Sequence, residues 1–264
     1  MEYTLDIRLP EHLSLRQKEL LRLVAEKGFA PVETLAQRLG VSTQTIRRDI
    51  GVLCEAKLLQ RFHGGAGIAD TAVRLGYAKK RTRNKEGKTR IAEAVAQAIP
   101  DKASIFLDVG TTVEAVAHAL LPRDGLRVFT HSMAAASVFN GHPTSEVFVT
   151  GGMLRGADGS LVGETALAGV SRFKAEFGVV ALSGFEEDGT LMDFDLEKVA
   201  IKQAIMSNSR TVFLVADASK FERIATVRVG SPSLVDSLFT DAPPPPFLAD
   251  VFEQAGVRVV VADQ

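Results

Sequence analysis

The segment from Val32 to Ile50, VETLAQRLGVSTQTIRRDI, constrains the fold of this chain more than any other stretch. Ala36, Gly40 and Ile46 have the spacing of two short helices packed across a tight turn. The small side chain of Ala36 allows the helices to approach closely, and Gly40 can adopt a positive φ in the turn. Ile46 would then return to a small core. The pattern predicts a helix-turn-helix.

The flanking sequence completes a small module. An apolar stripe predicts a helix from Arg16 to Lys27, and a third helix capped by Ser42 is expected to run to about Lys57. The run LLQRFHGGAGI predicts two short strands around a glycine turn, which makes the module a winged helix-turn-helix. The positions expected to be buried are Leu20, Leu21, Leu23, Val24, Leu35, Ala36, Leu39, Ile46, Ile50 and Leu53.

The exposed side of the third helix is short, polar and cationic, which suits the major groove of DNA. A solvated helix face is the alternative reading for Arg47 and Arg48, but it explains neither the turn spacing nor the wing. His63 lacks a Cys or His partner at metal-ligand spacing, so a backbone or turn role is expected. The candidate DNA-binding residues are Ser42, Thr43, Gln44, Thr45, Arg47, Arg48, Arg61 and His63.

Charge divides the chain sharply although the formal net charge is only −1. Residues 14–90 contain 17 Lys and Arg against 7 Asp and Glu, whereas residues 91–264 contain 13 against 22. Such asymmetry indicates a basic nucleic-acid module joined to an acidic globular one. A solvated basic linker would account for the charges from Lys79 to Lys88, but not for Arg47, Arg48 and Arg61.

Composition narrows the class of protein. The 264 residues, 46% of them hydrophobic, suffice for one large or two modest domains. The single Cys54 excludes an intrachain disulfide and fits a reducing cytosol. The opening sequence MEYTLDIRLPEHLS has no apolar run and no segment approaches about 20 apolar residues, so we expect neither a secretory signal nor a membrane span. The expectation is a cytoplasmic protein.

The rest of the chain predicts an α/β domain. After a helix from Lys88 to Ile99, helical stretches alternate with seven Val- and Phe-rich runs: SIFLDVG, LRVFTHS, EVFVTGG, FGVVALSG, TVFLVADAS, SLFTD and VRVVVA. Such runs suit strands buried on both faces of a largely parallel sheet. The expected organisation is a DNA-binding domain over residues 14–68, a linker over 69–87 and a ligand-sensing domain over 88–264.

Small, hydroxylated and charged residues follow five of these strands. Ligands in open α/β sheets sit beyond the carboxyl ends of the strands, where helix N-termini attract anions. Gly110 would allow backbone approach, Lys202 and Lys220 could neutralise a phosphate, and Asp193 could accept from a sugar or polyol hydroxyl. The candidate ligand-binding residues are Asp108, Gly110, Thr111, Thr112, Thr130, His131, Ser132, Gly151, Gly152, Ser183, Gly184, Asp193, Lys202 and Lys220.

Each of these signals has an ordinary structural explanation. Gly-Thr-Thr after a strand is at least as often a plain helix cap, and Gly151 and Gly152 could simply form a turn. A single lysine on a helix, such as Lys202, is usually solvated. The prediction depends on the convergence of five strand ends.

The segment GFAPVETLAQRLGVSTQTIRRDIGVLCEAKLLQRFHGG resembles the DNA-binding domain of DeoR-type bacterial repressors. FLDVGTTVEAVAHAL, VTGGMLRGADGSLVGETAL and LVADASKF resemble the sensor domain of the same family, so the resemblance spans nearly the whole chain after residue 14. DVGTTVEAVAHALL, NSRTVFLVADASKF and VDSLFTDAPPPP are most similar to members that respond to glycerol 3-phosphate. The chain departs from the family pattern at His131, Met153, Leu196 and Lys198.

The resemblance implies a sensor related in fold to ribose-5-phosphate isomerase, and a repressor that leaves operator DNA when a phosphorylated sugar or polyol binds. It also implies a homo-oligomer, for which a tetramer is plausible. We expect no cofactor, metal or catalytic residue. Another sugar phosphate is the alternative effector. A phosphosugar isomerase could draw its base and electrophile from Asp193, Glu197 and Lys202, and a nonspecific architectural DNA binder would show no ligand response.

Overall fold

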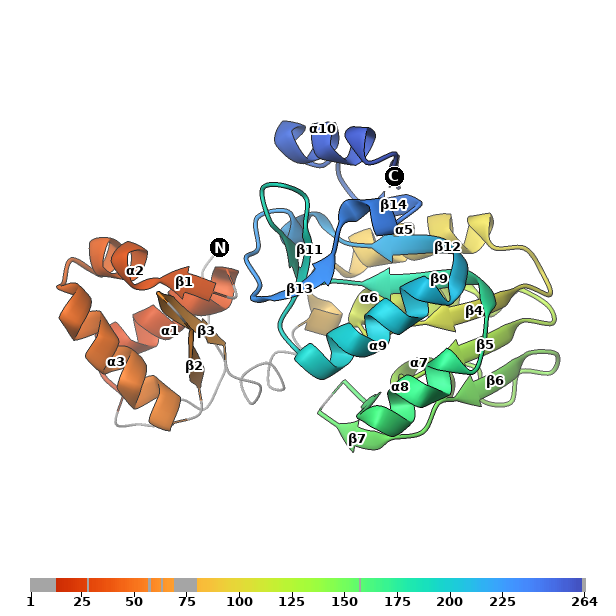
Figure 1. Ribbon diagram of the computed structural model, residues 1–264, viewed down its shortest axis with the longest axis horizontal. Coiled ribbons are helices and arrows are strands. Elements are labelled where there is room, and N and C mark those ends of the chain that lie inside the picture. Colours follow the sequence, from red (N-terminus) through yellow and green to blue (C-terminus); the bar gives the residue numbers. More distant parts are fainter. Residues whose placement is uncertain are drawn as a thin grey trace. The chain divides into compact units, whose positions relative to one another are not determined.

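The computed structural model describes residues 13–27, 29–56, 58–62, 64–68, 80–156 and 158–262. Two compact units divide the chain after Lys79, with the short segment 223–225 grouped with the first unit. Figure 1 shows the helices and strands of both units. His63 and residues 69–79 of the expected linker lie outside the described residues.

The first unit is a winged helix-turn-helix. Its helices and strands are α1 (Leu15–Lys27), β1 (Phe29–Pro31), α2 (Val32–Leu39), α3 (Thr43–Glu55), β2 (Leu59–Phe62) and β3 (Gly65–Ile68). The three strands form an antiparallel sheet in the order β1-β3-β2. The predicted wing is therefore confirmed as β2 and β3.

The core of this unit follows the helical period of the sequence. Gly40 ends α2 in the left-handed conformation with φ 65°, and Ser42 caps α3 by accepting a hydrogen bond from the Thr45 N–H. Both features were predicted. Leu39 is only half-buried rather than buried, because it is the last residue of α2. The other expected core positions are buried: Leu20, Leu21, Leu23, Val24, Leu35, Ala36, Ile46, Ile50 and Leu53.

Strand β1 was not predicted, because three residues that include Pro31 carry no strand signal. It pairs with β3, where a Cβ on Gly65 would lie 2.5 Å from the Ala30 carbonyl oxygen and 2.5 Å from the Phe29 ring. Gly65 therefore permits the close contact of β1 and β3.

Replacing Gly65 by alanine should open this contact. Overpacking of this kind costs about 1–3 kcal/mol, so we expect the amides of β1 and β3 to exchange hydrogen roughly 5- to 100-fold faster, as measured by hydrogen exchange. Gly64→Ala is the matched control, since Gly64 has φ 79° but no atom within 4 Å of an added Cβ. Equal protection losses in the two variants would argue against a contact specific to Gly65.

The second unit is built on a seven-stranded parallel sheet in the order β15-β14-β12-β9-β4-β5-β6. All seven predicted strands are present. They are β4 (Ser104–Leu107), β5 (Arg127–Thr130), β6 (Glu146–Val149), β9 (Ala175–Ala181), β12 (Ser209–Val215), β14 (Ser237–Thr240) and β15 (Arg258–Val261). From β4 the chain moves through β5 to β6, and from β9 it moves the other way, so β4 and β9 flank the point where the strand order reverses.

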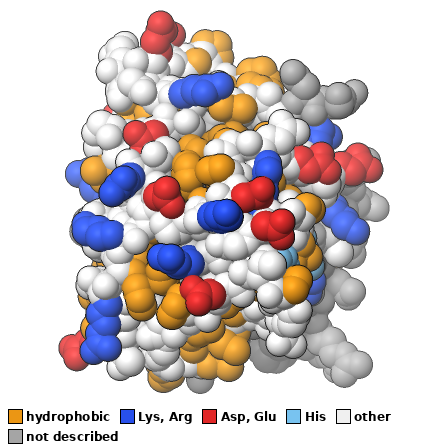
Figure 2. Space-filling model, turned by 90° about the vertical axis from the view of Figure 1, so that its right-hand side faces the viewer, with side chains coloured by type: hydrophobic (Ala, Val, Ile, Leu, Met, Phe, Trp, Pro, Cys, Tyr) orange, Lys and Arg blue, Asp and Glu red, His pale blue; other side chains and the backbone are white. Residues whose placement is uncertain are grey.

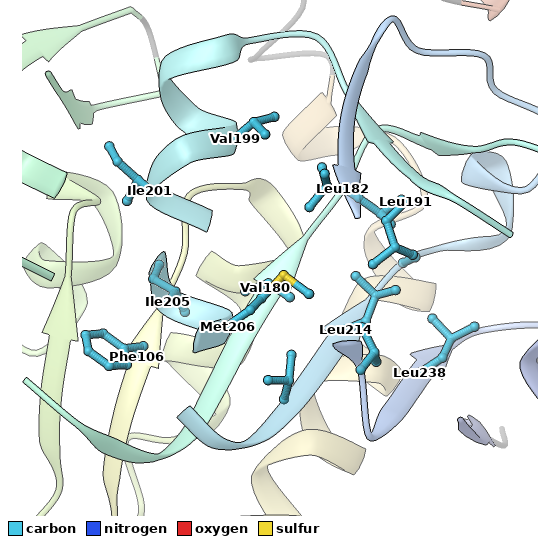
Figure 3. Close-up of a cluster of buried hydrophobic side chains, with 14 of the residues drawn as sticks. Phe106, Val180, Leu182, Leu191, Val199, Ile201, Ile205, Met206, Leu214 and Leu238 are labelled. Carbon is cyan, nitrogen blue, oxygen red and sulfur yellow. The ribbon is translucent and has the colours of Figure 1, made fainter. Parts of the chain in front are cut away.

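Helices cover both faces of the sheet (Figure 1). Strand residues alternate between the two resulting cores: Ile105 and Leu107 face one side, and Phe106 faces the other. One face carries α5 (Lys85–Ala98), α6 (Thr111–Ala119) and α7 (Met133–Val138), and the other carries α8 (Glu164–Ser171), α9 (Leu196–Ser207) and α10 (Pro246–Gln254). Figure 3 shows Ile205 and Met206 of α9 close to the strands that carry Val180 and Leu214.

Short elements complete the unit. A hairpin of β7 (Met153–Arg155) and β8 (Ser160–Val162) follows β6, and β10 (Gly184–Phe185), β11 (Leu191–Asp193) and β13 (Val227–Gly230) form a small antiparallel sheet. Two 3-10 turns are η1 (Ala218–Lys220) and η2 (Pro232–Leu234). In the part of the chain that the structure describes, no helix is both long and apolar enough to span a bilayer.

Helix α5 begins at Lys85, three residues before the predicted start at Lys88. Lys88 is buried and donates to the backbone carbonyls of Lys80 and Arg83, so the interpretation of this lysine as part of a solvated linker was wrong. Burial lowers the pKa of Lys88. Two carbonyls from the preceding turn solvate its ammonium in place of water.

Candidate DNA interface and effector site

The two sides of α3 have opposite character. Ile46, Asp49, Ile50 and Leu53 are buried along one side. Gln44, Arg47 and Arg48 are exposed on the other, at the i, i+3, i+4 spacing of a single helix face. Thr43 and Thr45 are half-buried beside that face. The predicted polar, cationic surface is therefore one continuous strip.

A buried acid that the sequence analysis did not select fixes the orientation of α3. The Asp49 carboxylate accepts from the Arg16 Nε at 2.6 Å and from the Gln17 Nε2 at 3.1 Å. These contacts join α1 to α3 and direct the opposite face of α3 outward. An acid on the apolar stripe of a predicted helix is the sequence signal that could have identified Asp49, because a buried carboxylate needs a partner.

Three candidate residues outside the exposed strip, Ser42, Thr45 and Arg61, have defined local contacts. The Ser42 hydroxyl lies 2.9 Å from the Thr45 hydroxyl and also caps α3, so both hydroxyls support the start of the helix. Arg61 of β2 is exposed and donates to the Arg47 carbonyl at 3.3 Å. The wing is thereby connected to α3, and Arg61 lies beside the cationic strip.

Three candidate effector residues form a buried cluster where the strand order of the sheet reverses. Asp108 follows β4 and is fully buried; its Oδ1 lies 2.9 Å from the His131 Nε2, and its Oδ2 accepts from the Lys202 ammonium. Lys202 reaches this point from α9, is only 3% exposed, and also donates to the Ala181 carbonyl at the end of β9. Lys202 is therefore not the solvated lysine that its position on a helix suggested.

The electrostatics of the cluster are those of a tight ion pair. Burial alone would raise the pKa of Asp108, but the Lys202 ammonium and the His131 ring hold it well below its ordinary value. Burial alone would lower the pKa of Lys202, but the charges of Asp108 and Asp193 raise it. Both groups therefore remain ionised at neutral pH.

Hydrogen bonds extend the cluster on both sides. The His131 Nδ1 lies 3.1 Å from the Leu161 carbonyl oxygen. Asp193, 3.6 Å from the Lys202 Nζ, accepts from the Ser183 hydroxyl at 2.7 Å. These polar groups hold β4, the end of β5, β8, β11 and α9 together at one edge of the sheet.

The Gly-Thr-Thr segment forms the start of α6. Gly110 is the N-cap with φ 145°, and in the part of the chain that the structure describes no side chain caps this end of the helix. The first-turn amides of Thr111 and Thr112 therefore lack a side-chain acceptor. An added Cβ on Gly110 would lie 3.4 Å from the Ala181 Cβ, so the turn lies beside the end of β9. The Thr111 hydroxyl donates to the Lys80 carbonyl at 3.4 Å, and Thr112 is buried.

The remaining candidates lie along the same edge of the sheet but further apart. The Thr130 hydroxyl donates to the Leu107 carbonyl, and Ser132 caps α7, so both have structural roles. Gly151 and Gly152 follow β6, whereas Lys220 follows β12 and lies 3.9 Å from the Asp217 carboxylate. Strands β6 and β12 are separated by four strand spacings, about 19 Å. Gly184 is buried at the start of β10.

The hairpin β7–β8 was not predicted, and it adds charged contacts at this edge. Arg155 pairs with Asp195 and Glu197, and Lys198 pairs with Asp158. Glu197 and Lys198 therefore attach the hairpin to the start of α9. Among the described residues, no three His, Cys, Asp or Glu side chains are grouped as a metal site requires.

Comparison with known proteins assigns both units. The DeoR-like helix-turn-helix domain matches residues 16–72, and the DeoR C terminal sensor domain matches residues 83–242. The chain belongs to the DeoR family. It is 42% identical to the glycerol-3-phosphate regulon repressor of Escherichia coli K12 over 87% of this chain and 91% of that protein. It is also 39% identical to the E. coli K12 HTH-type transcriptional repressor CsqR, over 94% and 95% respectively.

This DeoR-family chain is a DNA-binding repressor, and its exposed α3 strip lies on the family's DNA-binding module. Among solved structures, a D-ribose-5-phosphate isomerase in complex with phospho-erythronic acid aligns with 52% of this chain and 54% of that chain, at 13% identity and a TM-score of 0.39. A likeness of this size carries no argument about the site.

Proposed function

We propose that this repressor binds operator DNA through α3 and the wing, and that glycerol 3-phosphate releases it. The first-turn amides of α6 carry the proposal: among the described residues they have no side-chain acceptor, and they lie beside a fixed buried ion pair, at the strand ends where α/β sheets bind ligands. The name of the 42% identical relative supports the choice of effector. The coupling needed between the two sites is modest, about 1–3 kcal/mol.

The proposed effector site is narrower than the set of candidates. The phosphate is held by the start of α6, from Gly110 to Thr112, with Lys202 and Asp108 supporting that turn from within. Lys220, Gly151 and Gly152 follow strands on either side of this point. Calorimetric titration with glycerol 3-phosphate and a panel of sugar phosphates tests the assignment. Higher affinity for another phosphate ester would identify that compound as the effector instead.

Replacing Gly110 by alanine should abolish the response to the effector. A side chain at φ 145° strains the turn, and its methyl group lies against Ala181 at the end of β9, so the amides that we propose hold the phosphate would shift. We expect at least a tenfold loss of glycerol 3-phosphate affinity, with operator affinity within about twofold of wild type. The matched control is Gly163→Ala, because Gly163 is also a helix N-cap with positive φ and has nothing within 4 Å of an added Cβ. Loss of effector binding in both variants would count against the phosphate site.

An enzymatic role is disfavoured by the contacts of the acids. Asp108 pairs with Lys202 and contacts the His131 ring, and Asp193 accepts a hydrogen bond from Ser183 and pairs with Lys202. Neither carboxylate is placed as a free general base. Incubation with phosphosugars should therefore give no turnover, and robust isomerisation would favour an enzyme over a ligand-controlled repressor.

The proposal also covers how copies of the chain assemble. Strand β6 ends the sheet and exposes Phe148 and Val149, and the nearby hairpin exposes Met153 and Leu154. An apolar sheet edge of this kind supports a homo-oligomer, for which a tetramer is plausible.

On the face shown in Figure 2, acidic and basic side chains are intermingled, with no broad cationic surface for DNA. We place the linker before α5, which begins at Lys85, and the site of action in the cytoplasm, where operator DNA is found.

A further inference from the structure

A groove of about 910 Å³ runs between α5 and α6 and begins at the start of α6. Arg81, Lys85 and Thr111 line that end of the groove, and alanines such as Ala92 and Ala115 line its middle. Thr111 also belongs to the turn that we propose holds the phosphate. A ligand anchored at that turn can therefore extend into the groove.

Glu114 lines this groove and has a carboxyl oxygen without a hydrogen-bond partner among the described residues. It lies one turn after Thr111 on α6, lines the groove, and is 8% exposed. Its Oε1 is buried with no hydrogen-bond partner among the described residues, whereas its Oε2 forms an ion pair with the Arg81 Nε at 3.7 Å, beyond hydrogen-bond distance. A buried carboxyl oxygen without a partner costs stability, which indicates a functional reason for its position.

The surroundings of Glu114 hold it close to neutrality. Burial, and then the negative charge of Asp158 on the β7–β8 hairpin, raise the pKa of Glu114 to about 7. The other titratable and charged groups that line the groove are Arg81, Lys85, Lys88, Glu93, His118 and Arg123. Near neutral pH the Glu114 carboxyl can therefore accept a hydrogen bond from a hydroxyl or donate one to it.

The same surroundings decide the chemistry of the missing partner. A metal cation is disfavoured, because Arg81 and Lys85 line the groove at this end. A simple anion would occupy the cations and the α6 amides but would leave Glu114 Oε1 unsatisfied. A ligand that carries both a phosphate and hydroxyl groups satisfies the whole set.

We propose that Glu114 hydrogen-bonds to the hydroxyl groups of a phosphorylated polyol whose phosphate is held at the start of α6. This inference rests on the proposed function and adds to it the residue that distinguishes the polyol ester from inorganic phosphate. A site built to hydrogen-bond a hydroxyl discriminates against a ligand that lacks it, because the buried group is then left without a partner.

The test is the ratio of two affinities, measured by calorimetry on the full chain with glycerol 3-phosphate and with inorganic phosphate. In Glu114→Ala, glycerol 3-phosphate affinity should fall at least tenfold while phosphate affinity stays within twofold. Glu93→Ala is the matched control, since Glu93 lines the same groove but is exposed; both affinities should remain unchanged.

The outcomes separate the two proposals. If wild type binds glycerol 3-phosphate and Glu114→Ala keeps the wild-type ratio, the role of Glu114 is wrong and the proposed function stands. An equal loss for both ligands also rejects it, because Glu114 would then support the phosphate site. If wild type binds neither ligand, the proposed function and this inference both fail.

A second variant reports on the carboxyl without the ligand. Because the folded state raises the pKa of Glu114 from 4.5 to about 7, the folded protein holds a proton there that the unfolded chain has lost between these values. The urea midpoint of wild type should therefore fall as pH rises from 5 to 7, relative to Glu114→Gln, which lacks this titration. Parallel pH profiles would mean that the carboxyl is solvated, and would overturn the inference.

Discussion

Replacing Lys202 by methionine is expected to destabilise the folded chain by about 3–5 kcal/mol, the usual cost of removing one partner of a buried ion pair. The substitution keeps most of the side-chain volume but leaves the fully buried Asp108 without its ammonium partner. Urea denaturation at pH 7, followed by circular dichroism, measures the loss. The exposed Lys174, which donates to the Ser207 carbonyl, supplies the control: Lys174→Met should change stability by less than about 1 kcal/mol.

The pH dependence of this variant has a defined sign. In wild type the pKa of Asp108 is depressed, so its ion pair contributes stability above the unfolded pKa near 3.8 and loses it as pH falls through the folded value. Without Lys202, burial instead favours the protonated carboxyl. The stability gap between wild type and Lys202→Met should therefore narrow as pH falls from 7 to 4. A constant gap would show that the lost stability comes from packing.

A double-mutant cycle isolates the pair itself. The cycle compares the single variants Asp108→Asn and Lys202→Met with the double variant. The double variant has no unpaired buried charge, so its loss of stability should be smaller than the sum of the losses in the two single variants. Simple additivity would mean that the two groups do not interact in solution.

The second large effect is expected on DNA affinity. Replacing both Arg47 and Arg48 by alanine should weaken operator binding roughly 100-fold, because each exposed guanidinium on the α3 strip is placed to contact phosphate or a base edge. If both contact phosphates, the slope of log affinity against log salt should become shallower by about 1.8. Fluorescence anisotropy with operator DNA at several salt concentrations measures both quantities.

The control for this loss is Arg172→Ala, which removes an exposed arginine from the second unit and should leave operator affinity within about twofold of wild type. The circular dichroism spectrum and the urea midpoint of the Arg47 and Arg48 variant should be unchanged, since neither side chain is buried. Wild-type operator affinity in the double variant would contradict the assignment of α3 as the recognition helix.

The sequence was sufficient for the elements whose stability is local or whose residues are buried throughout. The spacing of Ala36, Gly40 and Ile46 specifies one turn geometry, and the Val- and Phe-rich runs are recognisable because the central strands are buried between two helix layers. The edge strand β6 is largely exposed, so the expectation that every run is buried on both faces was wrong for it. The elements that were missed are short or rich in glycine. Strand β1 and the β7–β8 hairpin depend on partners supplied by other parts of the chain.

The chemistry of the site was harder to predict, because burial is decided by contacts between distant residues. Lys202 and Asp108 are 94 positions apart, and nothing local shows that the lysine turns inward. The exposure of Glu114 likewise depends on how α5 packs beside α6. The sequence identified the strand ends as a region of interest, but it could not show which of their polar groups bind one another.

The reversal of strand order between β4 and β9 has a mechanical consequence. The chain leaves β4 into α6 on one face of the sheet, whereas the path from β9 leads to α9 on the other. A small molecule seated at this junction therefore touches both helical layers at once, whereas one bound at an outer strand would press on a single layer. Even a slight displacement there would be transmitted to the two sides of the domain together.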